Sequence, residues 1–187
     1  MRLLQSMNEP VILPLNVGGW EDGLYVTRDG LNFYSTYMPV DVFSLLDAFV
    51  EDPECFDYTP YYRPPLLDVD MATNPWGCKN FFQPDIIISQ RNNDSTPFQT
   101  WKSSNMKKSV SNEGAACGVL KNKDTFNVFV FTQNPDNDEN MEIMFMKNTS
   151  VNPDISDAVP IVSSTETEDN PHIERLEDNS LLLFFDR

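Results

Sequence analysis

The sequence predicts an all-β protein built from antiparallel, four-stranded sheets that stack face to face, and three observations support this prediction. Short runs of β-branched and aromatic residues recur along the chain, and turn-forming residues separate them. Several runs are apolar on both faces, yet the connections between them are too short to hold crossover helices. A pattern of an acidic residue followed by two strands occurs three times.

Length and charge narrow the class of protein. The chain has 187 residues, which favours one domain, and 40% of them are hydrophobic, as in globular proteins. It carries 13 Lys and Arg against 29 Asp and Glu, a formal net charge of -16. We therefore expect no binding to nucleic acid or to an anionic membrane. An acidic surface can attract cations or basic partners, although simple solvation of that surface is the plainer interpretation.

Cysteine and histidine usage argues against metal and cofactor chemistry. The three cysteines, Cys55, Cys78 and Cys117, are far apart and form no CxxC motif. A Cys55–Cys78 disulfide and buried free thiols both fit this pattern. His172 is the single histidine, so no multi-histidine site is expected, and no cofactor is predicted.

The sequence contains no targeting signal that we recognise. The first ten residues lack the apolar core of a signal peptide, and no run approaches the roughly 20 apolar residues of a membrane span. We expect a soluble protein that is not exported, cytoplasmic by default. The sequons at Asn93 and Asn148 matter only if the protein is exported.

The predicted strands follow one another with short turns. A hairpin at 24–37 has Asp29-Gly30 at its tip, a strong two-residue turn signal. The other predicted strands are 10–16, 84–90, 98–104, 115–120, 125–133, 141–148, 158–164, 172–176 and 181–185.

Residues 41–79 interrupt this rhythm. Asp41 precedes apolar residues at helical spacing, which predicts a short helix with Asp41 as its N-cap. The rest of the segment is rich in proline and aromatic residues and predicts an ordered insertion loop without a central strand.

The repeat aligns Glu21, Glu113 and Glu168. The first interval is about 37 residues longer than the second, close to the length of 41–79. The unit is therefore four strands, and its first copy carries the insertion. A single domain over 1–187 would contain one unit at 21–104, one at 113–164 and the start of a third at 168–187.

Strands that are apolar on both faces need a sheet on each side. Phe126, Val128 and Val130 are expected to point one way, with Phe129 and Phe131 pointing the other. Ile143 and Phe145 oppose Met144 and Met146 in the same manner, and 181–185 has no polar face. A ring of such sheets is a β-propeller, of which this chain supplies about two and a half blades. We expect missing blades or a second chain to close the ring.

Two parts of the sequence resemble known propeller repeats. Residues 21–37 and 168–186 resemble the TolB-type, WD-repeat-like repeat, in which an acidic mark, a short strand, an Asp-containing turn and an aromatic strand follow in order. The resemblance implies a propeller fold and says little about function. Residues 84–104 are also similar to sialidase-type repeats. The spacing from Asp94 to Trp101 is too long for their Asp-box and its glycine is missing, so sialidase chemistry does not carry over.

Arg28 and Arg175 occupy the same position in their repeats. Arginines around a propeller mouth could hold a carboxylate ligand in bidentate fashion. Leu120 stands at this position in the middle repeat and breaks the pattern. The simpler interpretation is a pair of surface arginines near Asp29 and Glu177.

Acidic residues mark the start of each predicted inner strand. Asp22, Glu113 and Asp169 could act as acid and base on a glycoside, or bind a cation. Their recurrence favours a structural role in which they accept backbone N–H groups of turns. His172 is expected to pack or to form a hydrogen bond, and 134–140 to be a polar loop rather than a calcium site.

Aromatic residues crowd the insertion and could stack on a sugar or peptide ligand, or fix the loop to its blade. They are Phe56, Tyr58, Tyr61, Tyr62 and Trp76.

Two functions remain open at this point. The first is a non-catalytic propeller scaffold that binds a protein or glycan ligand, for which we select Arg28, Arg175, Asp22, Asp169, Tyr61 and Trp76 as candidate contacts. The second is a fragment of a sialidase-like hydrolase. The hydrolase requires two acids and two arginines within a few ångströms in one pocket, so the positions of Arg28 and Arg175 discriminate the two.

Overall fold

The computed structural model describes residues 17–47, 59–63, 71–73, 80–82, 84–106, 112–134 and 140–187. The predicted strand at 10–16 lies outside this part of the chain. The described residues form a mostly β structure in which every paired strand is antiparallel, as predicted. The sheets contain four, four, two and two strands.

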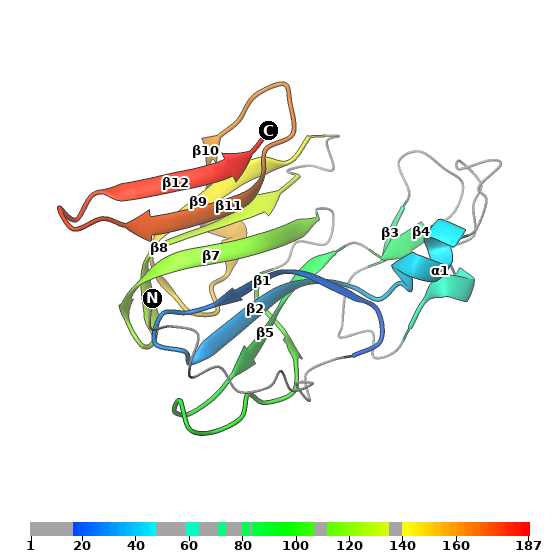
Figure 1. Ribbon diagram of the computed structural model, residues 1–187. Helices are drawn as coiled ribbons and strands as arrows, with labels where there is room; N and C mark the ends of the chain where they lie inside the picture. The colour runs from blue at the N-terminus through cyan, green and yellow to red at the C-terminus, as the bar shows by residue number, and fades with distance from the viewer. Residues whose placement is uncertain are drawn as a thin grey trace, which may run out of the picture.

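Each of the larger sheets is a meander, in which each strand pairs with the previous and the next strand of the same sheet (Figure 1). The first sheet has the order β1 (Trp20–Val26), β2 (Asn32–Met38), β5 (Asp85–Gln90) and β6 (Lys102–Ser103). The second consists of β7 (Glu113–Asn122), β8 (Thr125–Gln133), β9 (Glu142–Ser150) and β10 (Val159–Val162), with η4 (Ile155–Asp157) before its last strand. The third is the hairpin of β11 (Asp169–Arg175) and β12 (Leu181–Asp186).

The insertion contains a helix and a small hairpin. Helix α1 (Val42–Asp47) starts directly after Asp41, whose Oδ1 accepts the Ser44 N–H at 3.0 Å, so the predicted N-cap is confirmed. This bond, the Ser44 hydroxyl and the Arg63 guanidinium lower the pKa of the Asp41 carboxyl. The short helix η2 (Thr59–Tyr61) and the hairpin of β3 (Met71–Thr73) and β4 (Asn80–Phe82) were not predicted. Strand β6 is also much shorter than the predicted run at 98–104.

The second sheet is buried on both faces by neighbouring sheets. On one face Phe129 and Phe131 pack against Tyr34 and Ile86 of the first sheet. On the other face a cluster of Val128, Val130 and Ile143 packs against Ile173 of β11. The expected burial of the 126–131 strand between two sheets, the opposed Ile143 and Met144 faces, and strands at 126–131 and 181–185 are thereby confirmed. The expected cover on both faces of 181–185 is wrong for the described residues, because β12 is exposed except at Leu183, which is half-buried.

One expected side-chain direction is wrong. Phe126 joins Phe129 on the face toward the first sheet, rather than Val128 and Val130. The cause is a β-bulge: Leu120 pairs with Phe126 and Val119 pairs with Val128, so Asn127 is an extra residue in β8. The extra residue reverses the alternation of faces on one side of the bulge.

The first strands of the first three sheets carry the same bulge at the position that the repeat aligns. The register shifts after Asp22 in β1, after Gly114 in β7 and after Asp169 in β11. The residues that follow have left-handed backbone conformations, with φ of 58° at Gly23, 45° at Ala115 and 49° at Asn170. The sequence repeat therefore corresponds to a repeated backbone geometry.

We expect opposite effects from two substitutions at this repeated position. Gly23→Ala should lower the free energy of unfolding by about 1–2 kcal/mol, because a left-handed alanine is strained and its Cβ would lie 3.1 Å from the Ala115 Cα. Ala115→Gly removes such strain and should raise stability by up to about 1 kcal/mol. Urea denaturation of both variants tests the pair, and a loss of stability in both would contradict it.

The predicted hairpin with Asp29-Gly30 at its tip is confirmed, but the connection is longer than the expected two residues, because the Thr27 N–H donates to the Asn32 carbonyl across it. This turn has a counterpart in the third sheet. The Gly30 N–H donates to the Thr27 carbonyl at 2.7 Å, and Gly30 has a φ of 72°. Between β11 and β12, the Asn179 N–H donates to the Leu176 carbonyl at 3.0 Å, and Asn179 has a φ of 66°. Both are β-turns that end in a left-handed residue.

Candidate functional site

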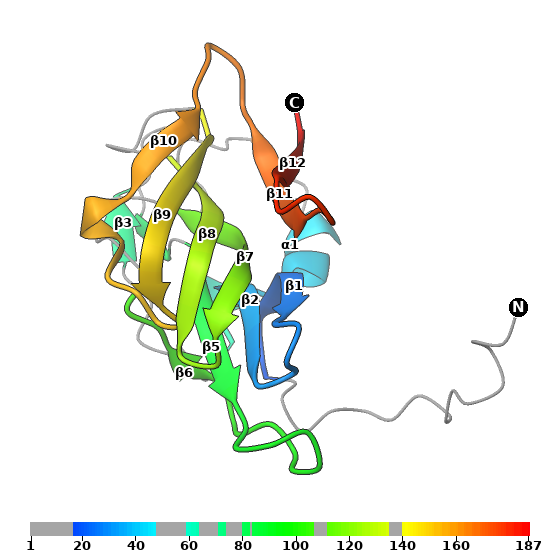
Figure 2. The same ribbon diagram turned by 90° about the vertical axis from the view of Figure 1, so that its left-hand side faces the viewer.

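Strands β1, β7 and β11, the first strands of the three sheets, lie side by side. Figure 2 shows β7 at the right-hand edge of the second sheet, with β11 and β1 beside it. The Tyr25 hydroxyl of β1 donates to the Gly118 carbonyl of β7, and the Cys117 thiol donates to the Pro171 carbonyl of β11 at 3.1 Å. Side chains from three repeats therefore meet along one surface.

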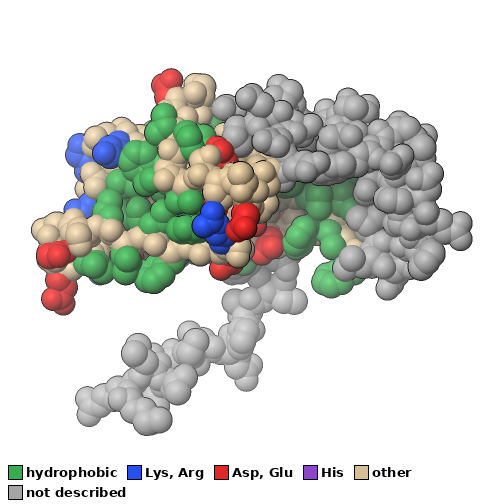
Figure 3. All heavy atoms as spheres, turned by 90° about the horizontal axis from the view of Figure 1, so that it is seen from above, with side chains coloured by type: hydrophobic (Ala, Val, Ile, Leu, Met, Phe, Trp, Pro, Cys, Tyr) green, Lys and Arg blue, Asp and Glu red, His purple; other side chains and the backbone are tan. Residues whose placement is uncertain are grey.

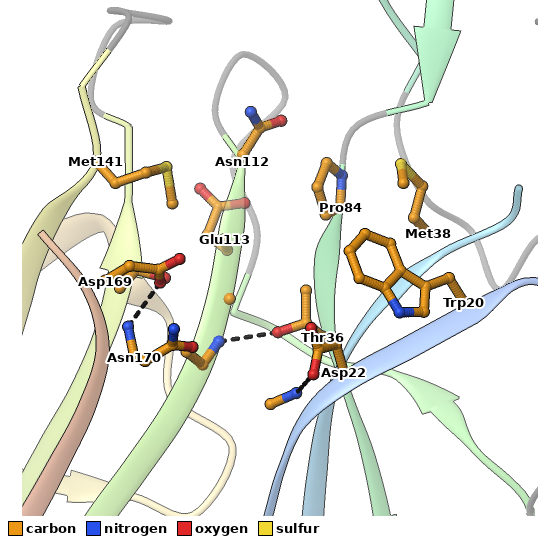
Figure 4. A pocket seen from close by; sticks show the side chains of 14 residues that line it. Trp20, Asp22, Thr36, Met38, Pro84, Asn112, Glu113, Met141, Asp169 and Asn170 are labelled. Atoms are coloured by element: carbon orange, nitrogen blue, oxygen red, sulfur yellow. Dashed lines mark hydrogen bonds between the residues drawn. The ribbon is translucent and has the colours of Figure 1, made fainter. Parts of the chain in front are cut away.

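A hollow of about 230 Å³, which we call the acidic hollow, lies where these three strands begin (Figure 4). Its lining comes from all three sheets and includes three carboxylates. The lining residues are Trp20, Asp22, Gly23, Thr36, Met38, Pro84, Asn112, Glu113, Gly114, Ala115, Thr132, Met141, Asp169 and Asn170.

Asp22 and Asp169, both candidates from the sequence, line this hollow and make the same local contact. One carboxylate oxygen of each accepts the N–H of the next residue at 2.7 Å, at Gly23 and at Asn170 respectively. This is the backbone-capping role that their recurrence favours. The other oxygen of Asp22 and of Asp169 has no hydrogen-bond partner in the described part of the chain, which leaves it available to a ligand.

Glu113 also lines the hollow but is held within the protein. Its side chain is 1% exposed and accepts a hydrogen bond from Gln133 Nε2 at 2.7 Å. Glu168, the aligned residue of the third repeat, is equally buried, accepts a hydrogen bond from the Ser164 hydroxyl and forms an ion pair with Arg187. We interpret the aligned glutamates as anchors of the strand starts, not as acid catalysts.

An aromatic and apolar wall lies across the hollow from Asp169 and Glu113, while Asp22 lies on the same side as this wall (Figure 4). Figure 4 places the Trp20 indole beside Met38 on the side of the hollow away from Asp169. Trp20 is 43% exposed, although tryptophan is usually well buried. The hydroxyl of Thr36, between the two sides, accepts the Ala115 N–H at 2.8 Å. Trp20, Asn112 and Met141 were not among the candidates; the one available signal was that Trp20 directly precedes the Glu21 mark.

Arg28 and Arg175 line a second hollow, of about 540 Å³, at the other end of the same strands. We call it the basic hollow. Its lining residues are Tyr25, Val26, Arg28, Gly118, Val119, Leu120, His172, Ile173, Glu174 and Arg175. The structure thus brings the two arginines to one surface. Leu120, the equivalent residue of the middle repeat, lines the same hollow.

The acids and the arginines do not converge. Asp169 is the first residue of β11 and Arg175 the last, which at about 3.3 Å per residue separates them by roughly 20 Å. The condition for the hydrolase, two acids and two arginines in one pocket, is therefore not met by the described residues. Nor do these residues contain a group of three or more His, Cys, Asp or Glu that could hold a metal ion.

The remaining candidates are Tyr61 and Tyr62, which line neither hollow, His172, which lines the basic hollow, and several that lie outside the described residues. Tyr61 belongs to η2, and its carbonyl accepts the Asp41 N–H at 2.8 Å. Tyr62 packs against the cluster around Phe33. His172 is exposed at the rim of the basic hollow, 3.9 Å from the Glu174 carboxylate. The candidates outside the described residues are Phe56, Tyr58, Trp76, Cys55, Cys78 and most of the loop 134–140.

One thiol and three phenol groups whose pKa is raised by burial make the fold sensitive to alkali. Burial raises the pKa of Cys117, Tyr25 and Tyr37 to about 12, and it also raises the pKa of Tyr34. Each group ionises more readily in the unfolded chain, so its stabilising effect is complete below about pH 9 and is lost as the pH rises to about 12. We expect the free energy of unfolding to fall steeply over this range. In urea titrations at several pH values, Cys117→Val should delay the onset of the fall; a flat profile would contradict this.

No protein-family model, curated protein or solved structure matches this chain. Among the described residues, no helix has the length and apolar character needed to cross a membrane.

Proposed function

We propose that the chain forms blades of a β-propeller and serves as a non-catalytic binding scaffold whose ligand is a basic segment of a protein partner. The observation that carries the proposal is that three sequence repeats contribute equivalent strand starts to one acidic hollow. In a propeller the innermost strands surround the axis, and ligands commonly bind at that opening.

Two features of the acidic hollow favour a cationic group. Asp22 and Asp169 each keep one carboxylate oxygen free of described partners, and both face the hollow. The half-exposed Trp20 indole lies on the side of Asp22 and across the hollow from Asp169, and an indole face attracts a guanidinium or ammonium group. A lysine or arginine side chain inserted into the hollow would meet the indole and the carboxylates.

The charge of the whole chain supports the same class of partner. A net charge of -16 creates a negative field that accelerates encounter with basic segments. No nucleic acid or membrane partner fits this field, and no cofactor is needed for such a role.

An array of immobilised nine-residue peptides, each with one central Arg, Lys, Glu or Gln, tests this function with the full chain. We expect Arg and Lys peptides to be retained, with retention falling as salt increases. Trp20→Ala, and Asp22→Asn combined with Asp169→Asn, should each weaken binding about tenfold. Asp157→Asn, an exposed carboxylate in η4 outside the hollow, is the matched control and should change binding less than about twofold.

Equal retention of Glu and Arg peptides would contradict the proposed ligand, as would an unchanged affinity of the Trp20 variant. The blade arrangement is tested separately by cryo-electron microscopy of the purified protein. Successive sheets rotated about a common axis would support it, whereas a straight stack of sheets would contradict it.

A further inference from the structure

We propose that the basic hollow is a second binding site, for a carboxylate attached to an aliphatic group. It lies at the opposite end of the first strands from the acidic hollow, and its ligand has the opposite charge. The inference therefore does not depend on the function proposed above, and either one can fail alone.

The two guanidiniums of the basic hollow have no partner within the described residues. Arg28 lies in the turn after β1 and is exposed, while Arg175 ends β11 and is half-buried. Neither forms an ion pair or a side-chain hydrogen bond there, although the chain has more than twice as many acids as basic residues. Two unpaired arginines from separate repeats that line one hollow form a suitable site for an anion.

Several lining residues of this hollow are apolar, which distinguishes its ligand from a simple inorganic anion. Among them Val26 is exposed, Val119 and Leu120 are half-buried, and Ile173 is buried. Tyr25 also lines the hollow, and its hydroxyl is occupied by the Gly118 carbonyl. An aliphatic chain can pack on these side chains while its carboxylate reaches the arginines, and about 540 Å³ is the size of a small-ligand pocket.

Two further ionisable groups border the site. Glu174 lines the hollow and opposes an anion, and His172, 3.9 Å from the Glu174 carboxylate, is its neighbour on β11. Removing the Glu174 charge should therefore strengthen binding, an effect that a purely apolar hollow would not show.

Isothermal titration of the full chain with sodium octanoate tests the proposal. We expect one molecule to bind with a dissociation constant of about 1 mM or below, and the uncharged 1-octanol to bind at least about tenfold more weakly. Arg28→Gln and Arg175→Gln should each weaken octanoate binding about tenfold or more, and Glu174→Gln should strengthen it severalfold. Lys123→Gln removes an exposed positive charge from the turn of the middle repeat and should have little effect.

A second experiment distinguishes two kinds of ligand that carry the same group, a small aliphatic carboxylate and the C-terminus of a peptide. A hexapeptide ending in a leucine carboxylate is compared with its C-terminal amide. Binding of the free peptide alone, with the same dependence on Arg28 and Arg175, would assign the site to a chain terminus. The proposal is overturned if neither carboxylate binds, if octanol binds as well as octanoate, or if both arginine variants, folded by circular dichroism, retain full affinity.

Discussion

Phe129→Ala is expected to lower the free energy of unfolding by about 3–5 kcal/mol, the range measured for large aromatic residues in closely packed cores. Phe129 is fully buried between the first and second sheets. Its ring lies 6.2 Å from that of Tyr34, 5.0 Å from that of Phe126 and 5.8 Å from that of Phe131. Because these rings come from two sheets, the cavity cannot close without moving one sheet toward the other. Urea denaturation followed by tryptophan fluorescence measures the effect.

Phe184→Ala provides the matched control for this substitution. Phe184 has the same side chain but is 55% exposed on β12, so its removal leaves no cavity and should cost less than about 1 kcal/mol. Equal losses in the two variants would mean that the contact between the first two sheets contributes no more than the exposed hairpin does.

The second large effect is expected from Gly118→Ala in β7, at about 1–3 kcal/mol or more. A Cβ at this position would lie 2.8 Å from the Val128 carbonyl oxygen and 2.8 Å from the Phe126 ring. The carbonyl belongs to the paired strand, so it cannot move aside without disturbing the ladder. The Gly118 carbonyl also accepts the Tyr25 hydroxyl, so a shift of this backbone disturbs the contact between the first strands of two sheets.

The same denaturation experiment with a double variant separates the two contacts of Gly118. Adding Phe126→Leu to Gly118→Ala relieves the ring contact but not the carbonyl contact, so a double-mutant cycle should recover part of the loss. Unchanged stability of Gly118→Ala alone would show that the two strands can separate freely at this point.

The sequence predicted the local elements well because their signals are local. Asp29 and Gly30 predict their turn through the left-handed preference of glycine, and Asp41 predicts a helix start through its bond to Ser44. The alignment of Glu21, Glu113 and Glu168 likewise predicted equivalent strand starts. The turn and the helix start each depend on residues within a few positions of one another, and the repeat was found by comparing such short local patterns.

Features that depend on distant pairing escaped prediction. The bulge at Asn127 is set by the register between β7 and β8 and reverses the face of Phe126. Trp20 and Met141 line one hollow only because the separate sheets that carry them lie next to each other. The distance between Asp169 and Arg175 could have been predicted from the sequence, because six positions along an extended strand keep two side chains far apart.

Within the described part of the chain, strand β12 has a pairing partner on one side only, and this affects the order in which parts of the protein unfold. Among the described residues β12 pairs only with β11, and Leu181, Leu182, Phe184 and Phe185 are exposed on it. Figure 3 shows hydrophobic side chains gathered on the upper face of the molecule. The outer amides of β12 therefore face solvent, and deuterium should replace their protons long before it enters β8, which has a paired strand on each side. The hairpin would thus detach and reattach while the first two sheets remain joined, and the protein would unfold from this side inward.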